Sequence, residues 1–114
     1  MLIDTHCHLD ASEFDADRDA VIKTASEQDI QMMVIPAVEK NNFEHVIQLA
    51  RKHANCVYSL GIHPMYVQNA KPEDIAALKT SIQKQIDQGF PPVAIGEIGL
   101  DFFVEGYDKD LQTF

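Results

Sequence analysis

Two histidines separated by a single residue stand near the start of the chain, in the run Asp4-Thr5-His6-Cys7-His8. In an extended segment, residues two apart face the same side, so the imidazoles of His6 and His8 point together and Cys7 points away. Two imidazoles that converge from one strand end form a chelate for a divalent transition metal ion. The alternative is that one ring is only a polar group at a strand end, but both rings would then need separate hydrogen-bond partners. We therefore predict that His6 and His8 bind metal.

A carboxylate between two glycines forms a second candidate site, in the run Gly96-Glu97-Ile98-Gly99. Glu97 directly follows an apolar run, and the glycines allow other backbone segments to approach closely. A carboxylate at a buried strand end must be ion-paired or bound to metal, because burying it alone costs too much. The sequence nearby offers no basic partner before Lys109, which favours metal over an ion pair. A carboxylate of this kind can bridge two ions.

Two further polar residues follow predicted strands. His63 lies between Gly61 and Pro64, which indicate a sharp strand-to-loop transition that aims the imidazole toward the strand ends. His63 is a candidate proton carrier or phosphate donor, unless it only caps the turn. Asp101 has three open interpretations: it orients a metal-bound histidine, binds substrate or caps a turn.

Four apolar runs alternate with segments of helical periodicity, and together they must position these side chains. The predicted strands are Leu2–Ile3, Met32–Ile35, Val57–Leu60 and Val93–Ile95, and the predicted helices are Asp17–Gln28, Lys40–His53, a helix from Pro72 to Gly89 and the start of a fourth at Asp110. The last three strands are continuous apolar runs, which is typical of strands buried on both faces.

The predicted helices carry two expectations about burial. In the third helix, an apolar stripe formed by Ile75, Leu78, Ile82 and Ile86 is expected to be buried. The histidines of the second helix, His45 and His53, are expected at the surface.

This alternation predicts a parallel α/β sheet, either an open doubly wound sheet or a (β/α)8 barrel. The candidate site residues follow strands one, three and four, and several strands that supply side chains to one point are typical of a barrel. A full barrel needs about 250 residues, whereas the chain has 114. We therefore predict a single incomplete domain over residues 1–114, the N-terminal half of a (β/α)8 TIM-type barrel with four parallel strands.

The chain is acidic, with 18 Asp and Glu residues, 9 Lys and Arg residues and a net charge of −9. This balance argues against nonspecific electrostatic adhesion to nucleic acid. A nucleic-acid substrate stays possible, because bound divalent cations would invert the local field. No apolar run is long enough to span a membrane and no secretory signal is recognisable. The two cysteines, Cys7 and Cys56, have no framework spacing and fit a cytoplasmic protein.

The runs Asp4–Asp10, Gly61–Pro64 and Gly96–Asp101 resemble the signature blocks of TatD-family hydrolases. These are barrels of the amidohydrolase superfamily that act as metal-dependent deoxyribonucleases. The blocks occur in the family's order with family-like spacers, so the resemblance covers essentially the whole chain. It implies that His6 and His8 bind one metal ion and that Glu97 bridges to a second. The remaining ligands of the family, two histidines and an aspartate, come from later strands, and no residue of this chain matches them.

The function that the resemblance implies is two-metal hydrolysis of DNA phosphodiesters, with His63 and Glu97 as catalytic residues. The two divalent ions would be Zn²⁺, Mn²⁺, Mg²⁺, Fe²⁺ or Ni²⁺. Two alternatives stay open: hydrolysis of an amide, ester or lactone by a related barrel, and a non-catalytic fragment. Because the later ligands are missing, residues 1–114 alone are expected to be inactive. Because strands one and four would have unpaired edges, they are also expected to be poorly stable or to self-associate.

Overall fold

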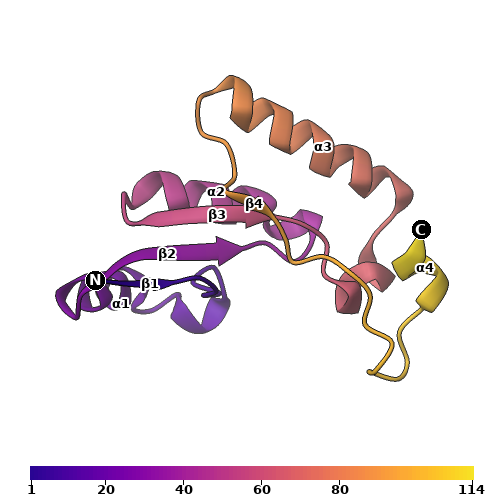
Figure 1. Cartoon of the computed structure of the whole chain (residues 1–114), viewed down its shortest axis with the longest axis horizontal. Coiled ribbons are helices and arrows are strands. Elements are labelled where there is room, and N and C mark those ends of the chain that lie inside the picture. The colour runs from indigo at the N-terminus through magenta and orange to yellow at the C-terminus, as the bar shows by residue number, and fades with distance from the viewer.

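The computed structural model describes all 114 residues and contains one parallel sheet with helices beside it (Figure 1). The strands are β1 (Leu2–Asp4), β2 (Ile30–Pro36), β3 (Cys56–Leu60) and β4 (Ala94–Ile95), and the α-helices are α1 (Arg18–Glu27), α2 (Phe43–Lys52), α3 (Pro72–Asp87) and α4 (Lys109–Thr113). Short 3-10 helices lie at η1 (Ser12–Phe14), η2 (Lys40–Asn42) and η3 (Pro64–Asn69). Each predicted strand and helix is present, except that the first turn of the predicted second helix is η2.

The strands pair in parallel and in chain order, β1-β2-β3-β4. A doubly wound sheet would reverse its strand order at a switch point, and no reversal occurs here. The sheet is therefore of the barrel type, as predicted. Because all four strands run in one direction, the loops that follow β1, β2, β3 and β4 all leave from the same edge.

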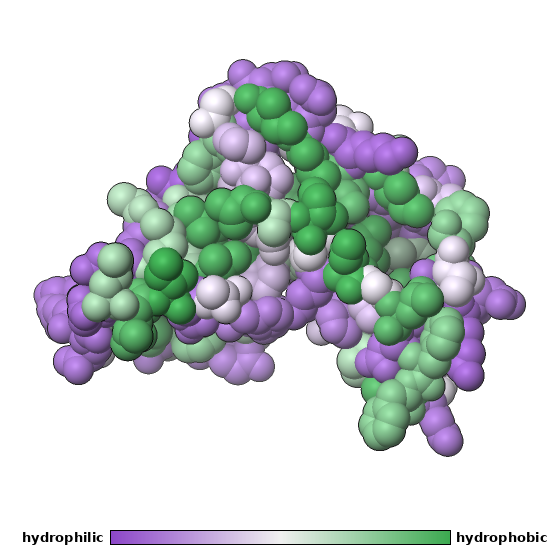
Figure 2. All heavy atoms as spheres, viewed as in Figure 1, coloured by the Kyte–Doolittle hydropathy of each residue, from purple (hydrophilic) through white to green (hydrophobic).

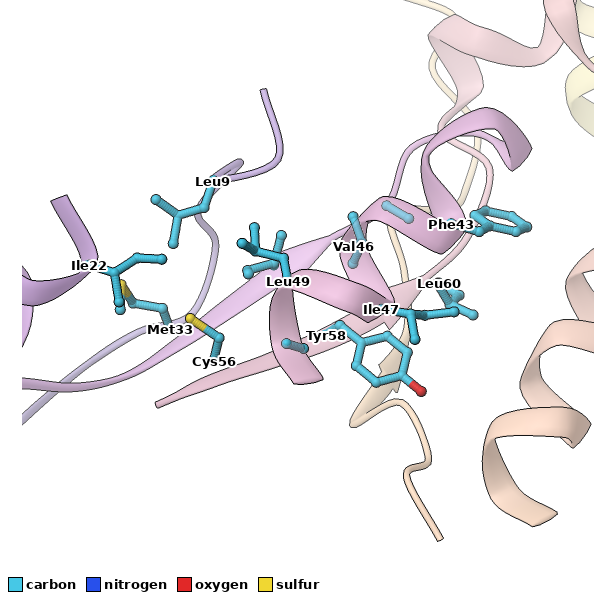
Figure 3. Close-up of a cluster of buried hydrophobic side chains, with 13 residues drawn as sticks. Leu9, Ile22, Met33, Phe43, Val46, Ile47, Leu49, Cys56, Tyr58 and Leu60 are labelled. Carbon is cyan, nitrogen blue, oxygen red and sulfur yellow. The ribbon is translucent and has the colours of Figure 1, made fainter. Parts of the chain in front are cut away.

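The hydrophobic core lies on one face of the sheet, between β2 and β3 and the helices α1 and α2 (Figure 3). Met33 and Ile35 of β2 are buried, and so are Tyr58 and Leu60 of β3. Residues two apart in a strand share a face, so these four side chains point to the same side of the sheet. The helices close this side with further buried side chains, namely Ile22, Phe43, Val46, Ile47, Leu49 and Ala50.

The prediction that the last three strands are buried on both faces is wrong for β4 and only partly confirmed for β2 and β3, because Met32, Val34 and Val57 are half-buried. Ala94 is exposed and Ile95 is 48% exposed, because β4 is an edge strand that pairs only with β3. The other edge strand, β1, leaves Leu2 61% and Ile3 58% exposed. Both edges are thus unpaired and apolar, as expected of half a barrel. Exposed hydrophobic residues extend across the face of the molecule that Figure 2 shows.

The predicted apolar stripe of α3 is only partly covered. Leu78 and Ile82 pack against the core, whereas Ile75 and Ile86 are 38% and 49% exposed. A helix buries its stripe only where another element covers it, and here the two ends of the stripe have no such cover. Gln85 is buried instead, and its side-chain oxygen accepts a hydrogen bond from Arg51 of α2 at 2.6 Å.

The two histidines of the second helix differ. His45 is exposed, as predicted. His53 is the C-cap of α2, and its side chain is only 17% exposed because it lies against Asp19 of α1, with Nε2 3.1 Å from Oδ1. The ammonium group of Lys52 and, to a smaller extent, His53 hold the pKa of Asp19 below its usual range. No helix combines the length and hydrophobicity that crossing a membrane requires.

Candidate metal centre

The two N-terminal histidines lie just beyond the end of β1 and converge. Their Nε2 atoms are 3.1 Å apart, and the rings meet edge to face with centroids 4.9 Å apart. The segment stays close to β2 because the Cys7 N–H donates to the Val34 carbonyl at 3.0 Å. Cys7 itself packs against the core. The alternation predicted for His6, Cys7 and His8 is therefore observed, with the rings on the side opposite the thiol.

The Glu97 carboxylate meets these two histidines. Its Oε1 lies 2.5 Å from Nε2 of His6 and 3.6 Å from Nε2 of His8. The three side chains offer one ligand atom each, and all three atoms lie within 4.8 Å of one another. The carboxylate is 21% exposed, so the cluster is open to solvent on one side. The structure thus brings together the three predicted metal ligands; metal binding itself stays a prediction.

The position of Glu97 is set by contacts of the preceding residue with β3. The Gly96 N–H donates to the Leu60 carbonyl at 3.0 Å, and the Ser59 hydroxyl donates to the Gly96 carbonyl at 3.1 Å. Gly61 lies so close that a Cβ there would be 2.7 Å from the carbonyl carbon of Gly96. The Gly96–Glu97 peptide bond is cis. Contacts with Ser59, Leu60 and Gly61 therefore hold the backbone that carries the Glu97 carboxylate.

The donor set fits a divalent transition metal ion. Ligand atoms about 2.0–2.1 Å from a tetrahedral ion lie roughly 3.3 Å from each other. The two separations at His8, 3.1 and 3.6 Å, are close to that value, whereas Nε2 of His6 and Oε1 of Glu97, 2.5 Å apart, are in direct polar contact and would have to separate to share an ion. Two imidazole nitrogens and one carboxylate oxygen suit Zn²⁺, Mn²⁺, Fe²⁺ or Ni²⁺ better than Mg²⁺, which prefers oxygen ligands.

His63 lies outside this three-residue cluster. Its Nδ1 accepts a hydrogen bond from the Met65 N–H at 3.0 Å, so it caps the start of η3. The main-chain N–H of His63 donates to the Val38 carbonyl at 2.8 Å, and the His63 ring meets the Tyr66 ring edge to face. Because Nδ1 accepts, a neutral imidazole here carries its proton on Nε2, which makes that atom a donor. His63 therefore caps the turn and still has a donor to offer.

A groove of about 670 Å³ connects His63 with the cluster, since His8, His63 and Glu97 all line it. Three further carboxylates line the same groove, namely Asp10, Glu13 and Glu39. Neither lysine nor arginine lines it. The groove is therefore strongly acidic, a field that favours bound cations and opposes phosphate unless cations are present.

Asp101 caps a turn in this structure, one of its three predicted roles. Its Oδ1 accepts hydrogen bonds from the Phe103 and Val104 N–H groups at 3.1 and 3.4 Å. Its main chain is held by the Gln112 amide of α4, which both accepts from the Asp101 N–H and donates to the Asp101 carbonyl. Asp101 does not belong to the cluster of His6, His8 and Glu97.

Sequence reasoning singled out neither Asp10 nor Asn42, which hydrogen-bond to each other beside the groove at 2.7 Å. Asp10 belongs to the first signature block, but no periodicity marks its partner. The one available signal for Asn42 was its place directly before an apolar helical segment, where asparagine is a preferred cap. Ser59 was also missed, because a serine within an apolar strand resembles a tolerated small residue.

The family model for TatD related DNase matches residues 3–113 of this chain. Over 101 residues, the chain is 33% identical to the uncharacterised metal-dependent hydrolase YjjV of Escherichia coli K12, and the match covers 89% of this chain and 38% of YjjV. Over 110 residues it is 36% identical to the human deoxyribonuclease TATDN3, with the same coverage of 89% and 38%. The chain thus spans about two fifths of the length of these relatives.

The solved structures agree with the sequence relatives. The crystal structure of YjjV, a TatD homologue from Escherichia coli K12, superposes with a TM-score of 0.87 at 30% identity and covers 98% of this chain and 42% of that chain. The four parallel strands and their helices therefore correspond to a half-barrel. The family match over nearly the whole length, together with this superposition, shows that the chain belongs to the TatD-related DNase family of metal-dependent hydrolases.

Proposed function

We propose that this chain is the N-terminal part of a deoxyribonuclease that hydrolyses DNA phosphodiesters with two divalent metal ions. The observation that carries the proposal is the convergence of His6, His8 and Glu97 at the rim of the groove that His63 also lines. The deoxyribonuclease name of the human relative supports DNA as the substrate.

In this proposal His6 and His8 would hold one ion, and Glu97 would bridge it to a second. The chemistry that such ions supply is the activation of a water molecule and the stabilisation of negative charge on the attacking and leaving oxygens. Glu97 suits the bridging role because it is a hard oxygen ligand whose place is set by the contacts of the preceding residue, Gly96, with Ser59 and Gly61. The other ligands of the second ion would come from residues outside this chain.

His63 acts in this proposal as a hydrogen-bond donor to a phosphate oxygen. The Met65 N–H occupies its Nδ1, so Nε2 is the nitrogen available to substrate and carries the proton in the neutral ring. A donor placed at the reacting phosphate stabilises the charge that develops there. This favours the phosphate-donor role over that of a general base, which would need an unprotonated Nε2.

We further propose that residues 1–114 alone do not cleave DNA and that they self-associate. Only three candidate ligands converge here, fewer than two ions require. The exposed apolar edge strands support association, because Leu2, Ile3 and Ile95 are each at least 48% exposed.

The test uses a form of the protein that includes strands corresponding to the later strands of the relatives. Glu97→Ala should abolish divalent-dependent DNA hydrolysis, and His63→Ala should lower turnover by about 10²–10⁴ with metal content unchanged. Bound metal is measured by inductively coupled plasma analysis, and hydrolysis is assayed on DNA and on amide and lactone substrates. Metal-dependent cleavage of an amide or lactone with no cleavage of DNA would contradict the proposal. Loss of metal in His63→Ala would show that His63 is a ligand.

A further inference from the structure

We propose that Asn42 is a positioning residue that, through Asp10, sets the distance between His8 and His63 across the groove. The effect of Asn42 on metal binding and activity rests on the proposed function, whereas its effect on the distance between His8 and His63 concerns residues of this chain alone. Asn42 ends the short helix η2, which follows β2. No candidate metal ligand lies on that loop, so its part in the site would be indirect.

The Asn42 side chain uses both ends of its amide. Its Nδ2 donates to Oδ2 of Asp10 at 2.7 Å. Its Oδ1 accepts from the main-chain N–H groups of Val38 and Glu39 at 3.1 and 3.2 Å. Asp10 is two residues beyond His8, and its other oxygen, Oδ1, is buried without a hydrogen-bond partner. The amide of Asn42 is thus the one group in the chain that hydrogen-bonds to the Asp10 carboxylate.

The same contacts continue to the other side of the groove. Val38 donates its main-chain N–H to Asn42. Its carbonyl accepts a hydrogen bond from the main-chain N–H of His63 at 2.8 Å. A continuous path of hydrogen bonds therefore runs from Asp10 through Asn42 and Val38 to His63. It joins the loops that follow β1, β2 and β3, and the residues at its two ends line the groove together with His8.

The chemistry of the pair explains why an amide suits position 42. Asn42 donates to a carboxylate through its nitrogen and accepts from two N–H groups through its oxygen, whereas an ionised carboxylate in its place could only accept. In Asn42→Asp the two acceptor contacts survive, but a second carboxylate would face Asp10 at 2.7 Å. The loop after β1 would then move away, and His8 would move with it. Partners that orient metal ligands in this way typically contribute about 10–100-fold in metal affinity or activity.

Exchange of the two residues provides a specific test. In the double variant Asp10→Asn with Asn42→Asp, the amide at position 10 donates to the carboxylate at position 42, which still accepts from the two N–H groups. The matched control is Asn41→Asp, which adds the same charge one residue earlier at an exposed position. Circular dichroism and thermal unfolding show whether each variant is folded.

Two readouts separate this inference from the proposed function. The first is the affinity for Zn²⁺ by calorimetry: we expect Asn42→Asp to bind about 10–100-fold more weakly, with Asn41→Asp unchanged and the exchange variant close to the wild type. The second is the imidazole NMR signals of His8 and His63 in metal-free protein, which should shift in Asn42→Asp and return in the exchange variant. If the wild type binds no Zn²⁺, the metal assignment fails and the NMR signals still decide the positioning role. Unchanged signals in Asn42→Asp, or an exchange variant as perturbed as Asn42→Asp, would overturn the inference.

Discussion

Gly61, at the end of β3, lies against Gly96 so closely that a methyl group has no room between them: a Cβ on Gly61 would be 2.7 Å from the carbonyl carbon and 2.8 Å from the carbonyl oxygen of Gly96. Gly96 directly precedes Glu97, the carboxylate of the candidate metal centre. We therefore expect Gly61→Ala to push this backbone outward and to displace the Glu97 carboxylate from His6 and His8.

The predicted cost of Gly61→Ala is about 1–3 kcal/mol in the free energy of unfolding, as for other overpacked sites, and about a tenfold or greater loss of metal affinity. Chemical denaturation and calorimetric metal titration measure the two effects. Ser59→Ala is the matched comparison, because it removes the hydroxyl contact to the Gly96 carbonyl without adding an atom. It should weaken metal binding less than Gly61→Ala does. Equal metal affinity in Gly61→Ala and the wild type would show that the close approach does not position Glu97.

The buried thiol of Cys56 gives a prediction for alkaline pH. Burial, with a smaller contribution from nearby Cys7, raises the pKa of the Cys56 thiol from 9.0 to about 11. Between these values the unfolded chain loses the proton and the folded chain keeps it, so folding stability should fall as the pH rises from 9 to 11. Thermal unfolding across this range should show a steeper loss in the wild type than in Cys56→Ala. Parallel pH profiles would contradict the assignment.

Under the proposed function, the acidic groove predicts that divalent ions are needed for DNA binding as well as for cleavage. Asp10, Glu13 and Glu39 line the groove with Glu97, and no lysine or arginine offsets them. Fluorescence anisotropy with a labelled, cleavage-resistant oligonucleotide should therefore show binding with Mn²⁺ and little binding with EDTA. The double variant Glu13→Gln with Glu39→Gln should bind more tightly in EDTA than the wild type. Equal affinity with and without Mn²⁺ would mean that DNA uses another surface.

The two exposed sheet edges predict the behaviour of residues 1–114 expressed alone. Leu2, Ile3, Val93 and Ile95 are 48–61% exposed, so we expect self-association by light scattering and binding of a hydrophobic dye. Ile3→Lys with Ile95→Lys should reduce both signals, since charged side chains block strand edges. A monomeric chain that binds no dye and cleaves DNA with Mn²⁺ would contradict both this expectation and the half-barrel interpretation.

The sequence alone predicted the element order and the convergence of the three candidate ligands, because both depend on local rules. Strand periodicity places His6 and His8 on one side, and parallel strands bring their carboxyl ends to one edge. The burial of α3 and β4 could not be predicted in the same way. Ile86 and Ile95 have the apolar pattern of buried residues, but their exposure depends on which other segments cover them.

The contacts around the site were also beyond sequence reasoning, for a related reason. The hydrogen bond between Asn42 and Asp10 joins residues 32 positions apart, and that between Ser59 and Gly96 joins residues 37 apart. No helical or strand periodicity connects positions so distant. Such pairs become visible only when the register of the sheet has placed the loops beside one another.

Calorimetric titration of the metal-free chain with Zn²⁺ tests most directly whether a metal ion binds to His6, His8 and Glu97. His6→Ala, His8→Ala and Glu97→Ala are compared with the wild type and with His45→Ala, which removes an exposed histidine of α2 that lies outside the cluster. We predict saturable binding by the wild type and by His45→Ala, and its loss in each of the other three variants. Saturable binding that survives in all three would contradict the assignment, as would the absence of any binding by the wild type.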